Sequence, residues 1–319
     1  MPELITRSER LHPEVRELLE KMDSEGAPPL ESQDPVEARN ARVKPMAELG
    51  GKPDVLGRVE DLSVPGPAGD VPVRLYANEA GGLRPALIYF HGGGFVFGNL
   101  DTHDAVCRAI AKASGAVVIS VDYRLAPEHK FPAAVDDSYA ATLWVAANAE
   151  KLGIDARRIA VGGDSAGGNL ATVIAMRCRD AGRPALAAQL LIYPVTDVST
   201  FETGSHREFA EGYFLSRAAM QWFTGHYLAS ADQKSHPEAS PLLASNLSGL
   251  PPALVITAEF DPLRDEGEAY AERLKQAGVP VTVRRYPGMI HGFVSMQGVL
   301  AGGREAIQEA AQFAQSVHA

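Results

Sequence analysis

The stretch from Val161 to Leu170 reads VGGDSAGGNL and decides how the rest of the chain is interpreted. It lies between an apolar run, RIAVGG, and a helical pattern, NLATVIAMRC. Within it, Gly163 to Gly167 fits G-x-S-x-G, a pattern in which the serine stands on a sharp strand-to-helix turn. Small residues on both sides let strand and helix approach closely at such a turn. Ser165 is therefore a candidate nucleophile, and the alternative is a helix-capping serine in a glycine loop.

A phosphate-binding loop is a competing interpretation of these glycines. A Walker loop beginning at Gly162 would need lysine where Gly168 stands. The dinucleotide spacing G-x-G-x-x-G fails here and also from Gly92 to Phe97. Both nucleotide interpretations are therefore weak. A helix N-terminus beneath Ser165 would instead stabilise negative charge that develops beside the serine during a reaction.

Short apolar runs alternate with helical patterns on both sides of this stretch. The predicted strands are ALIYF (86–90), VVISV (117–121), IAVGG (159–163), QLLIY (189–193), ALVIT (253–257) and VTVRRY (281–286), with helices near 103–113, 133–150, 168–181 and 266–277. Upstream, RVEDLSV and VPVRLYA flank the turn sequence PGPAGD, which indicates an antiparallel pair. About eight strands with crossover helices predict an α/β fold whose mostly parallel sheet is covered on both faces.

Two regions depart from this alternation. Residues 1–50 indicate short amphipathic helices, such as Pro13 to Met22, that form an accessory element. Between QLLIYP and ALVIT lie roughly sixty residues where a crossover needs about a dozen, and 199–235 is predicted to be an insertion. The main domain is then 51–198 with 236–319. Aromatic residues gather in and near the insertion, and a core of its own is favoured over a site lining for most of them: Phe201, Phe209, Tyr213, Phe214, Trp222, Phe223 and Tyr227.

The segment His91-Gly92-Gly93-Gly94 follows the predicted strand ALIYF. Ligands of an open parallel sheet bind beyond the carboxyl ends of its strands, so this loop and Ser165 are expected at the same edge. Successive glycines can aim backbone N–H groups at an oxygen that gains charge, and losing one such donor typically costs about 3 to 4 kcal/mol. The alternative is a glycine turn packed against another loop.

A serine nucleophile needs a base, and His291 is the best candidate because it directly follows the predicted strand VTVRRYPG. His91 is expected to anchor the glycine loop, and His103 and His129 to make structural hydrogen bonds. Most of the remaining histidines are expected at the surface: His12, His206, His226, His236 and His318.

The acid that orients the base is best matched by Asp261, which comes directly off the strand ALVITAEF. Its position before Pro262 is also typical of a helix N-cap. Glu259, Asp265 and Asp197 lie close enough in sequence to compete. The order serine, acid, histidine favours Asp261.

Composition limits the classes of partner. The 40 acidic and 30 basic side chains give a formal charge of -10, which disfavours nucleic acid and anionic membranes. The two cysteines, Cys107 and Cys178, lie in apolar helical contexts, so a disulfide framework is not expected. The N-terminal residues show no continuous apolar stretch, so neither a signal peptide nor a membrane span is predicted. A cytoplasmic location follows by elimination.

Several segments together resemble one known family. HGGGF, DYRLAPEHKFPAA, GDSAGGNLA, DPLRDEGEAYA and HGF are similar in order and spacing to the hormone-sensitive-lipase-like family of bacterial α/β-hydrolase carboxylesterases, in its GDSAG branch. The resemblance runs from about Leu83 to the C-terminus. It implies the α/β-hydrolase fold with a mobile helical cap, built from the N-terminal segment and an insertion after the sixth strand.

The resemblance also implies roles for individual residues. Ser165 would be the nucleophile, Asp261 the acid and His291 the base. The oxyanion donors would be Gly93, Gly94 and Ala166, with His91 and Gly92 supporting the loop. No metal and no cofactor are implied. The segment Asp122 to Pro132 is structural in the family, so Asp122, Arg124 and Glu128 are not assigned to catalysis.

The expected reaction is hydrolysis of a short- to medium-chain ester through an acyl-enzyme on Ser165, with activity rising through about pH 6 to 7. The expected partner is a small-molecule ester, with no nucleic acid and no stable membrane insertion. The family often forms homodimers through the sheet edge or the C-terminal helices. Two alternatives stay open: hydrolysis of an amide, lactone or carbamate, and a binding protein on the same fold. Plant hormone receptors that are similar to this family keep the pocket but lack the histidine that corresponds to His291.

Overall fold

The computed structural model describes residues 7–78 and 81–316, which include a single mixed sheet of eight strands. The strands are β1 (Arg58–Gly66), β2 (Gly69–Ala77), β3 (Arg84–Phe90), β4 (Val117–Val121), β5 (Ile154–Asp164), β6 (Ala188–Ile192), β7 (Ala253–Phe260) and β8 (Val281–Ile290). Their order across the sheet is β1-β2-β4-β3-β5-β6-β7-β8. β1 and β2 form the antiparallel pair that the turn sequence predicts, and β2 also pairs antiparallel with β4. All further pairs are parallel, so the predicted mostly parallel sheet is confirmed.

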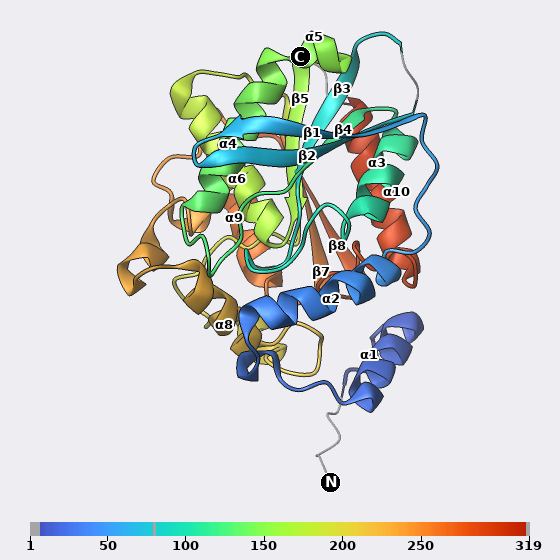
Figure 1. The fold of residues 1–319 in the computed structure, drawn as a ribbon. Coiled ribbons are helices and arrows are strands. Elements are labelled where there is room, and N and C mark those ends of the chain that lie inside the picture. The colour runs from blue at the N-terminus through green and yellow to red at the C-terminus, as the bar shows by residue number, and fades with distance from the viewer. Residues whose placement is uncertain (1–6, 79–80, 317–319) are drawn as a thin grey trace.

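Helices cover both faces of the sheet (Figure 1). One face carries α4 (Ala133–Ala147), α6 (Ala166–Ala181) and α9 (Arg264–Gln276), with the short α5 (Ala149–Leu152) beside β5. The other face carries α3 (Asp104–Ser114) and α10 (Ala301–Ser316). The central strands β3, β4 and β6 read as continuous apolar runs because both of their faces are buried in these two cores.

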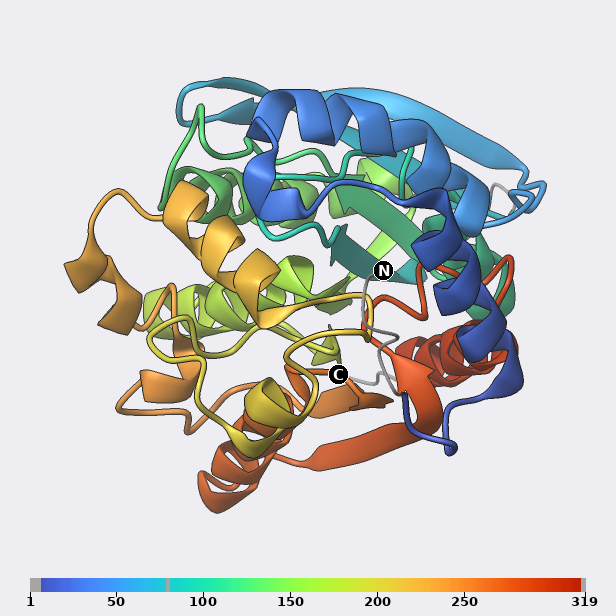
Figure 2. The ribbon, with the colours of Figure 1, turned by 90° about the horizontal axis from the view of Figure 1, so that it is seen from below.

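The two irregular regions meet over one end of the sheet. Residues 13–49 contain α1 (Pro13–Glu25), a 3-10 turn (Leu30–Ser32) and α2 (Pro35–Leu49). The chain between β6 and β7 contains α7 (Gly204–Glu208), α8 (Arg217–Tyr227) and two further 3-10 turns, Ala231–Ser235 and Pro241–Leu243. α8 contacts the turn Leu30–Ser32. Figure 2 looks onto this end, with α1 and α2 in blue and α8 in gold.

Helix α1 is fastened to the end of β8. The backbone N–H of His12 donates to the carbonyl of Gly288 (3.1 Å), and the Glu14 carboxylate accepts from the N–H of Ala301 (2.7 Å). Arg10 pairs with Glu259 (2.7 Å), whose other oxygen accepts from the N–H of Gly288 (2.8 Å). The N-terminal segment therefore docks beside the strand that leads to His291.

Both cysteines are buried and unpaired within the described ranges, as expected. One expectation about the histidines is wrong. His206, which was expected at the surface, is fully buried, and its ring lies 3.1 Å from the buried carboxylate of Glu266. His318 lies outside the described residues. None of the helices in residues 7–78 and 81–316 combines the length and apolar character that a membrane crossing needs.

Candidate active site

The register of the parallel strands brings the candidate residues to one level. Phe90 pairs with Gly163, Asp164 with Ile192, and Phe260 with Ile290. The residues that follow these strand ends are His91, Ser165, Asp261 and His291. Residues that lie far apart in sequence therefore share the carboxyl edge of the sheet, where parallel sheets place their ligands.

Ser165 occupies a sharp turn between β5 and α6. Its backbone has φ 55° and ψ -117°, a conformation that a residue other than glycine rarely adopts. A side chain at Gly163 or at Gly167 would overlap the backbone carbonyl of Phe90, which explains why small residues flank the serine. Helix α6 begins directly at Ala166, two residues before the predicted start, so its first N–H groups lie beside Ser165.

The side chains of Ser165, His291 and Asp261 form a hydrogen-bonded line. His291 Nε2 is 2.9 Å from Ser165 Oγ, and His291 Nδ1 is 2.8 Å from Asp261 Oδ2. Asp261 is completely buried, and its Oδ1 accepts from the N–H of Leu263 (2.8 Å). With Nδ1–H donating to this carboxylate, Nε2 can accept the hydroxyl proton of Ser165.

The other candidate acids have different partners. Glu259 binds Gly288 and Arg10. Asp265 lies in the first turn of α9 and accepts from the N–H of Ser205 (2.7 Å). Asp197 accepts from Ser199 (2.8 Å from its N–H). Only Asp261 among these four lies at hydrogen-bond distance from His291 in the described part of the chain.

The glycine loop lies against the serine turn. Gly93 and Gly94 have φ values of 119° and 61°, in the region that favours glycine. Among the hydrogen bonds of the described residues, none uses the backbone N–H of Gly93, Gly94 or Ala166, whereas the N–H of Gly92 donates to Asp164 (3.0 Å). The donors predicted from sequence are thus unoccupied and near Ser165.

His91 is buried and belongs to the frame of this loop. Its Nδ1 donates to the carbonyl of Gly92 (2.9 Å), and its ring stacks on Tyr123 at 4.3 Å between centroids. The Tyr123 hydroxyl donates to the His91 carbonyl (2.7 Å). Burial lowers the pKa of His91 to about 3, so the ring is neutral at physiological pH.

Sequence reasoning missed the residue that joins the loop to the turn, Asp164. Its Oδ1 accepts from the Gly92 N–H and from the Tyr89 hydroxyl (2.9 Å), and it lies 3.2 Å from His103 Nε2. Burial raises the pKa of Asp164, but His103 and the Tyr89 hydroxyl outweigh burial, so its pKa lies below the ordinary value. The sequence did carry one signal for this role. Close packing at the serine turn requires small residues, and the acid directly before the serine is not explained by that requirement.

Arg124 and Glu128, in the stretch Asp122 to Pro132, form ion pairs with structural partners. Arg124 pairs with Asp137 (2.7 Å), and Glu128 pairs with Arg39 of α2 (2.7 Å). Burial raises the pKa of Asp122 to about 6. Arg124 and Glu128 therefore hold parts of the fold together within the described residues.

A cavity of about 860 Å³ opens above Ser165 and His291. Its floor includes the glycine loop, and its walls come from residues 22–49 and from the chain between β6 and β7. The aromatic residues expected to form a separate core divide between two roles. Phe201, Phe214 and Phe223 line the cavity, whereas Phe209, Tyr213 and Tyr227 are buried and do not line it. Trp222 packs against Phe97 and Phe223 and does not line the cavity either.

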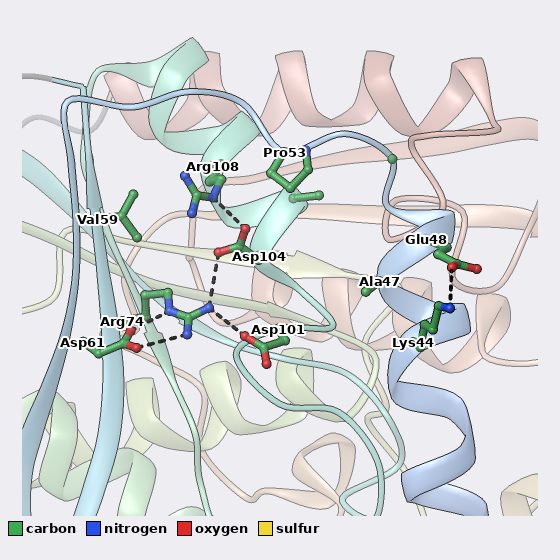
Figure 3. A pocket seen from close by; sticks show the side chains of 12 residues that line it. Lys44, Ala47, Glu48, Pro53, Val59, Asp61, Arg74, Asp101, Asp104 and Arg108 are labelled. Carbon is green, nitrogen blue, oxygen red and sulfur yellow. Dashed lines mark hydrogen bonds and ion pairs between the residues drawn. The ribbon is translucent and has the colours of Figure 1, made fainter.

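A second hollow, of about 640 Å³, lies between α2, α3 and the β1–β2 pair (Figure 3). Its charged groups neutralise one another. Arg74 pairs with Asp61 (2.5 Å) and Asp101 (2.9 Å), and Arg108 pairs with Asp104 (2.6 Å). None of the sequence-predicted site residues lines it.

Known proteins are similar to this chain in sequence and in fold. A family model described as the alpha/beta hydrolase fold matches residues 87–295. The carboxylic ester hydrolase LipN of Mycobacterium tuberculosis is 43% identical over 93% of this chain and 81% of its own length. The ethyl acetate hydrolase of Pseudomonas putida is 41% identical, over 88% and 89% of the two chains.

Among solved structures, an ester hydrolase from the metagenome of Lake Arreo superposes with a TM-score of 0.93 at 48% identity, over 96% of this chain and 98% of that one. The match to the family model covers more than half of the chain, and the relatives match it over most of its length. The chain therefore belongs to the hormone-sensitive-lipase-like family of α/β-hydrolases, as its motifs indicated.

Proposed function

We propose that this protein is a serine carboxylesterase that hydrolyses short- to medium-chain esters through an acyl-enzyme on Ser165. Its relatives carry the names of ester hydrolases, which places it in that class of enzyme. The observation that carries the mechanism is the hydrogen-bonded line from Ser165 through His291 to Asp261 at the base of the cavity.

The proposed reaction has two halves. His291 takes the proton of Ser165 as Oγ attacks the ester carbonyl, and it then gives that proton to the departing alkoxide. Asp261 holds the Nδ1–H tautomer and stabilises the imidazolium. Water then attacks the acyl-enzyme with the same proton transfers, which releases the acid and restores Ser165.

The oxyanion of each tetrahedral intermediate would be bound by the N–H groups of Gly93, Gly94 and Ala166. These donors are supported by two features. They have no hydrogen-bond partner among the described residues, and Ala166 directly follows Ser165 while Gly93 and Gly94 line the same cavity as Ser165. Each fixed donor is worth about 3 to 4 kcal/mol at the transition state because it needs no reorientation during the reaction.

The cap is proposed to consist of residues 1–50 and 199–235, over the catalytic domain 51–198 with 236–319. Support comes from the cavity walls, to which both segments contribute. The wall includes apolar side chains from both segments, Met46 and Leu49 on one side and Met220 and Phe223 on the other. Such a chamber favours an apolar acyl chain of limited length over a long triglyceride.

The proposal is tested with p-nitrophenyl esters of increasing acyl length. We expect the wild type to prefer short or medium chains and Ser165→Ala to lose at least about a thousandfold in kcat. Ser63→Ala, on the exposed strand β1, is the matched control and should retain wild-type rates. Substantial activity in Ser165→Ala, or an inert wild type, would overturn the proposal.

A further inference from the structure

Arg42, on α2, places a half-buried positive charge in the wall of the cavity that contains Ser165. Its guanidinium lies over the ring of Phe97, with Cζ 5.5 Å from the ring centroid. Nη1 donates to the side-chain oxygen of Gln33 (3.0 Å) and to the carbonyl of Ala38 (3.1 Å). No hydrogen bond or ion pair among the described residues uses Nε or Nη2. That edge of the guanidinium is the one that binds carboxylates side by side.

Two other arginines show how carboxylates can neutralise a cation in this chain. Arg39, about one turn earlier on α2, makes two bonds to Glu128 (2.7 and 2.8 Å) and donates to two backbone carbonyls. Arg74 in the second hollow is neutralised by aspartates (Figure 3). Arg42 has no carboxylate within ion-pair distance in residues 7–78 and 81–316, and burial lowers its pKa. In the described part of the chain, Arg42 therefore lacks the kind of carboxylate partner that Arg39 and Arg74 have.

Phe97 links Arg42 to the reacting centre. The Phe97 N–H donates to the carbonyl of Gly93 (2.8 Å), so the ring beneath the guanidinium belongs to the same loop that faces Ser165. A ligand that extends from Ser165 along this loop would therefore meet Arg42 at its far end. An arginine half removed from water attracts an anion more strongly than an exposed one, because less solvent screens it.

We propose that Arg42 binds an anionic group at the far end of the substrate, and that this protein hydrolyses esters whose acyl or alcohol part ends in a carboxylate. The inference rests on the proposed function, since Ser165 must attack the other end of the same molecule. Arg42 is then a specificity-determining residue that takes no part in the proton transfers.

Carboxylates also line the cavity, and their positions are compatible with this assignment. Glu25, Glu31 and Glu211 are exposed at the rim, where water and salt screen them. Asp164 already accepts hydrogen bonds from the Gly92 N–H and the Tyr89 hydroxyl, and it lies 3.2 Å from His103 Nε2. Asp197, which follows β6, is the buried acid that the substrate anion must avoid, so the anion is directed toward α2.

The test compares esters that differ only in a terminal charge. Monoethyl adipate and ethyl hexanoate vary the acyl end, and the acetate ester of ω-hydroxyhexanoate and hexyl acetate vary the alcohol end. The measured quantity is kcat/KM for the charged ester divided by kcat/KM for the uncharged ester. Each rate is measured from the acid that hydrolysis releases. This ratio does not depend on how much of a variant is folded. In Arg42→Gln we expect it to fall about 10- to 100-fold in at least one pair, because the loss falls mainly on the charged ester.

Two further variants control the result. Arg42→Lys keeps the charge but loses the planar fork, and should retain part of the ratio. Lys44→Gln removes an exposed cation from the same helix and should leave the ratio at the wild-type value. An unchanged ratio in both pairs, or an equal loss on charged and uncharged esters, would overturn the inference while leaving the proposed function intact. If Ser165→Ala still hydrolysed the uncharged esters, the proposed function would fall instead.

Discussion

At the scale of single residues, Asp164 joins the two halves of the proposed machinery. It stands on the serine turn and holds the glycine loop through the N–H of Gly92. In Asp164→Asn the amide cannot accept from Gly92, Tyr89 and His103 together, so the loop donors should shift from their positions. We expect kcat to fall about 10- to 1,000-fold with little change in KM, because the loss concerns the transition state.

Steady-state kinetics on one p-nitrophenyl ester measures this effect. Tyr89→Phe removes a single donor to Asp164 and leaves both the carboxylate and the Gly92 bond in place, so its loss should be the smaller of the two. Equal losses in the two variants, or a loss confined to KM, would contradict a positioning role for Asp164.

The sequence made the residues at strand ends predictable, because each follows an apolar run and the parallel register then aligns them. Ser165, Asp261 and His291 are of this kind, and the structure brings them together. Asp164 and Arg42 could not be assigned in this way. Their significance depends on partners, or on the absence of partners, that only the folded chain defines.

At the scale of secondary-structure elements, α7 is held by α9 through buried polar contacts. The N–H of Thr203 donates to His206 Nδ1 (3.2 Å), so Nε2 carries the ring proton, and Nε2 lies 3.1 Å from Glu266 Oε2. Glu266 also accepts from the N–H groups of Thr196 (2.7 Å) and Asp197 (3.2 Å). One carboxylate on α9 therefore fixes both α7 and the loop after β6.

Glu266→Gln should loosen this anchor, because a side-chain amide cannot satisfy His206 and both backbone donors at once. We expect the free energy of unfolding to fall by about 1 to 3 kcal/mol. Chemical denaturation at neutral pH measures the change, with Glu272→Gln on the exposed face of α9 as the control. A stability equal to that of the control would refute the anchor.

The strands and the four crossover helices followed from hydrophobic periodicity, and the predicted helix from Pro13 to Met22 corresponds to α1. The periodicity did not indicate the bounds of α2 or of α10. Helix α2 contains Pro45 and shows no clear amphipathic stripe, since one side faces the cavity and the other lines the second hollow through Lys44, Ala47 and Glu48. The burial of His206 was missed for a similar reason. Its partner Glu266 is 60 residues away in sequence, and no local pattern records that contact.

At the scale of the whole molecule, the buried neutral His91 makes the fold sensitive to acid. Its folded-state pKa of about 3 lies below the ordinary value of about 6.5. At pH values between these two, the His91 side chain binds a proton in the unfolded chain but not in the folded chain. The contribution of His91 to stability is therefore full above about pH 6.5 and declines as the pH falls toward 3.

In His91→Phe, which keeps a ring against Tyr123, the free energy of unfolding should depend less steeply on pH between about 6.5 and 4. The overall stability is expected to fall, because the bond to the Gly92 carbonyl is lost, so the slope is the diagnostic quantity. His129→Asn alters an exposed histidine and should retain the wild-type slope. An unaltered slope in His91→Phe would show that other groups govern acid unfolding.

The attachment of α1 to the end of β8 affects how the N-terminal segment can be studied. His12 is bonded to Gly288, three residues before His291 in the chain. Deleting the segment would thus release the strand that supports the general base as well as open the chamber. A truncated enzyme with little activity would then have two indistinguishable defects. Point substitutions that face the chamber from α2 avoid this ambiguity, since they leave the clamp at Gly288 intact.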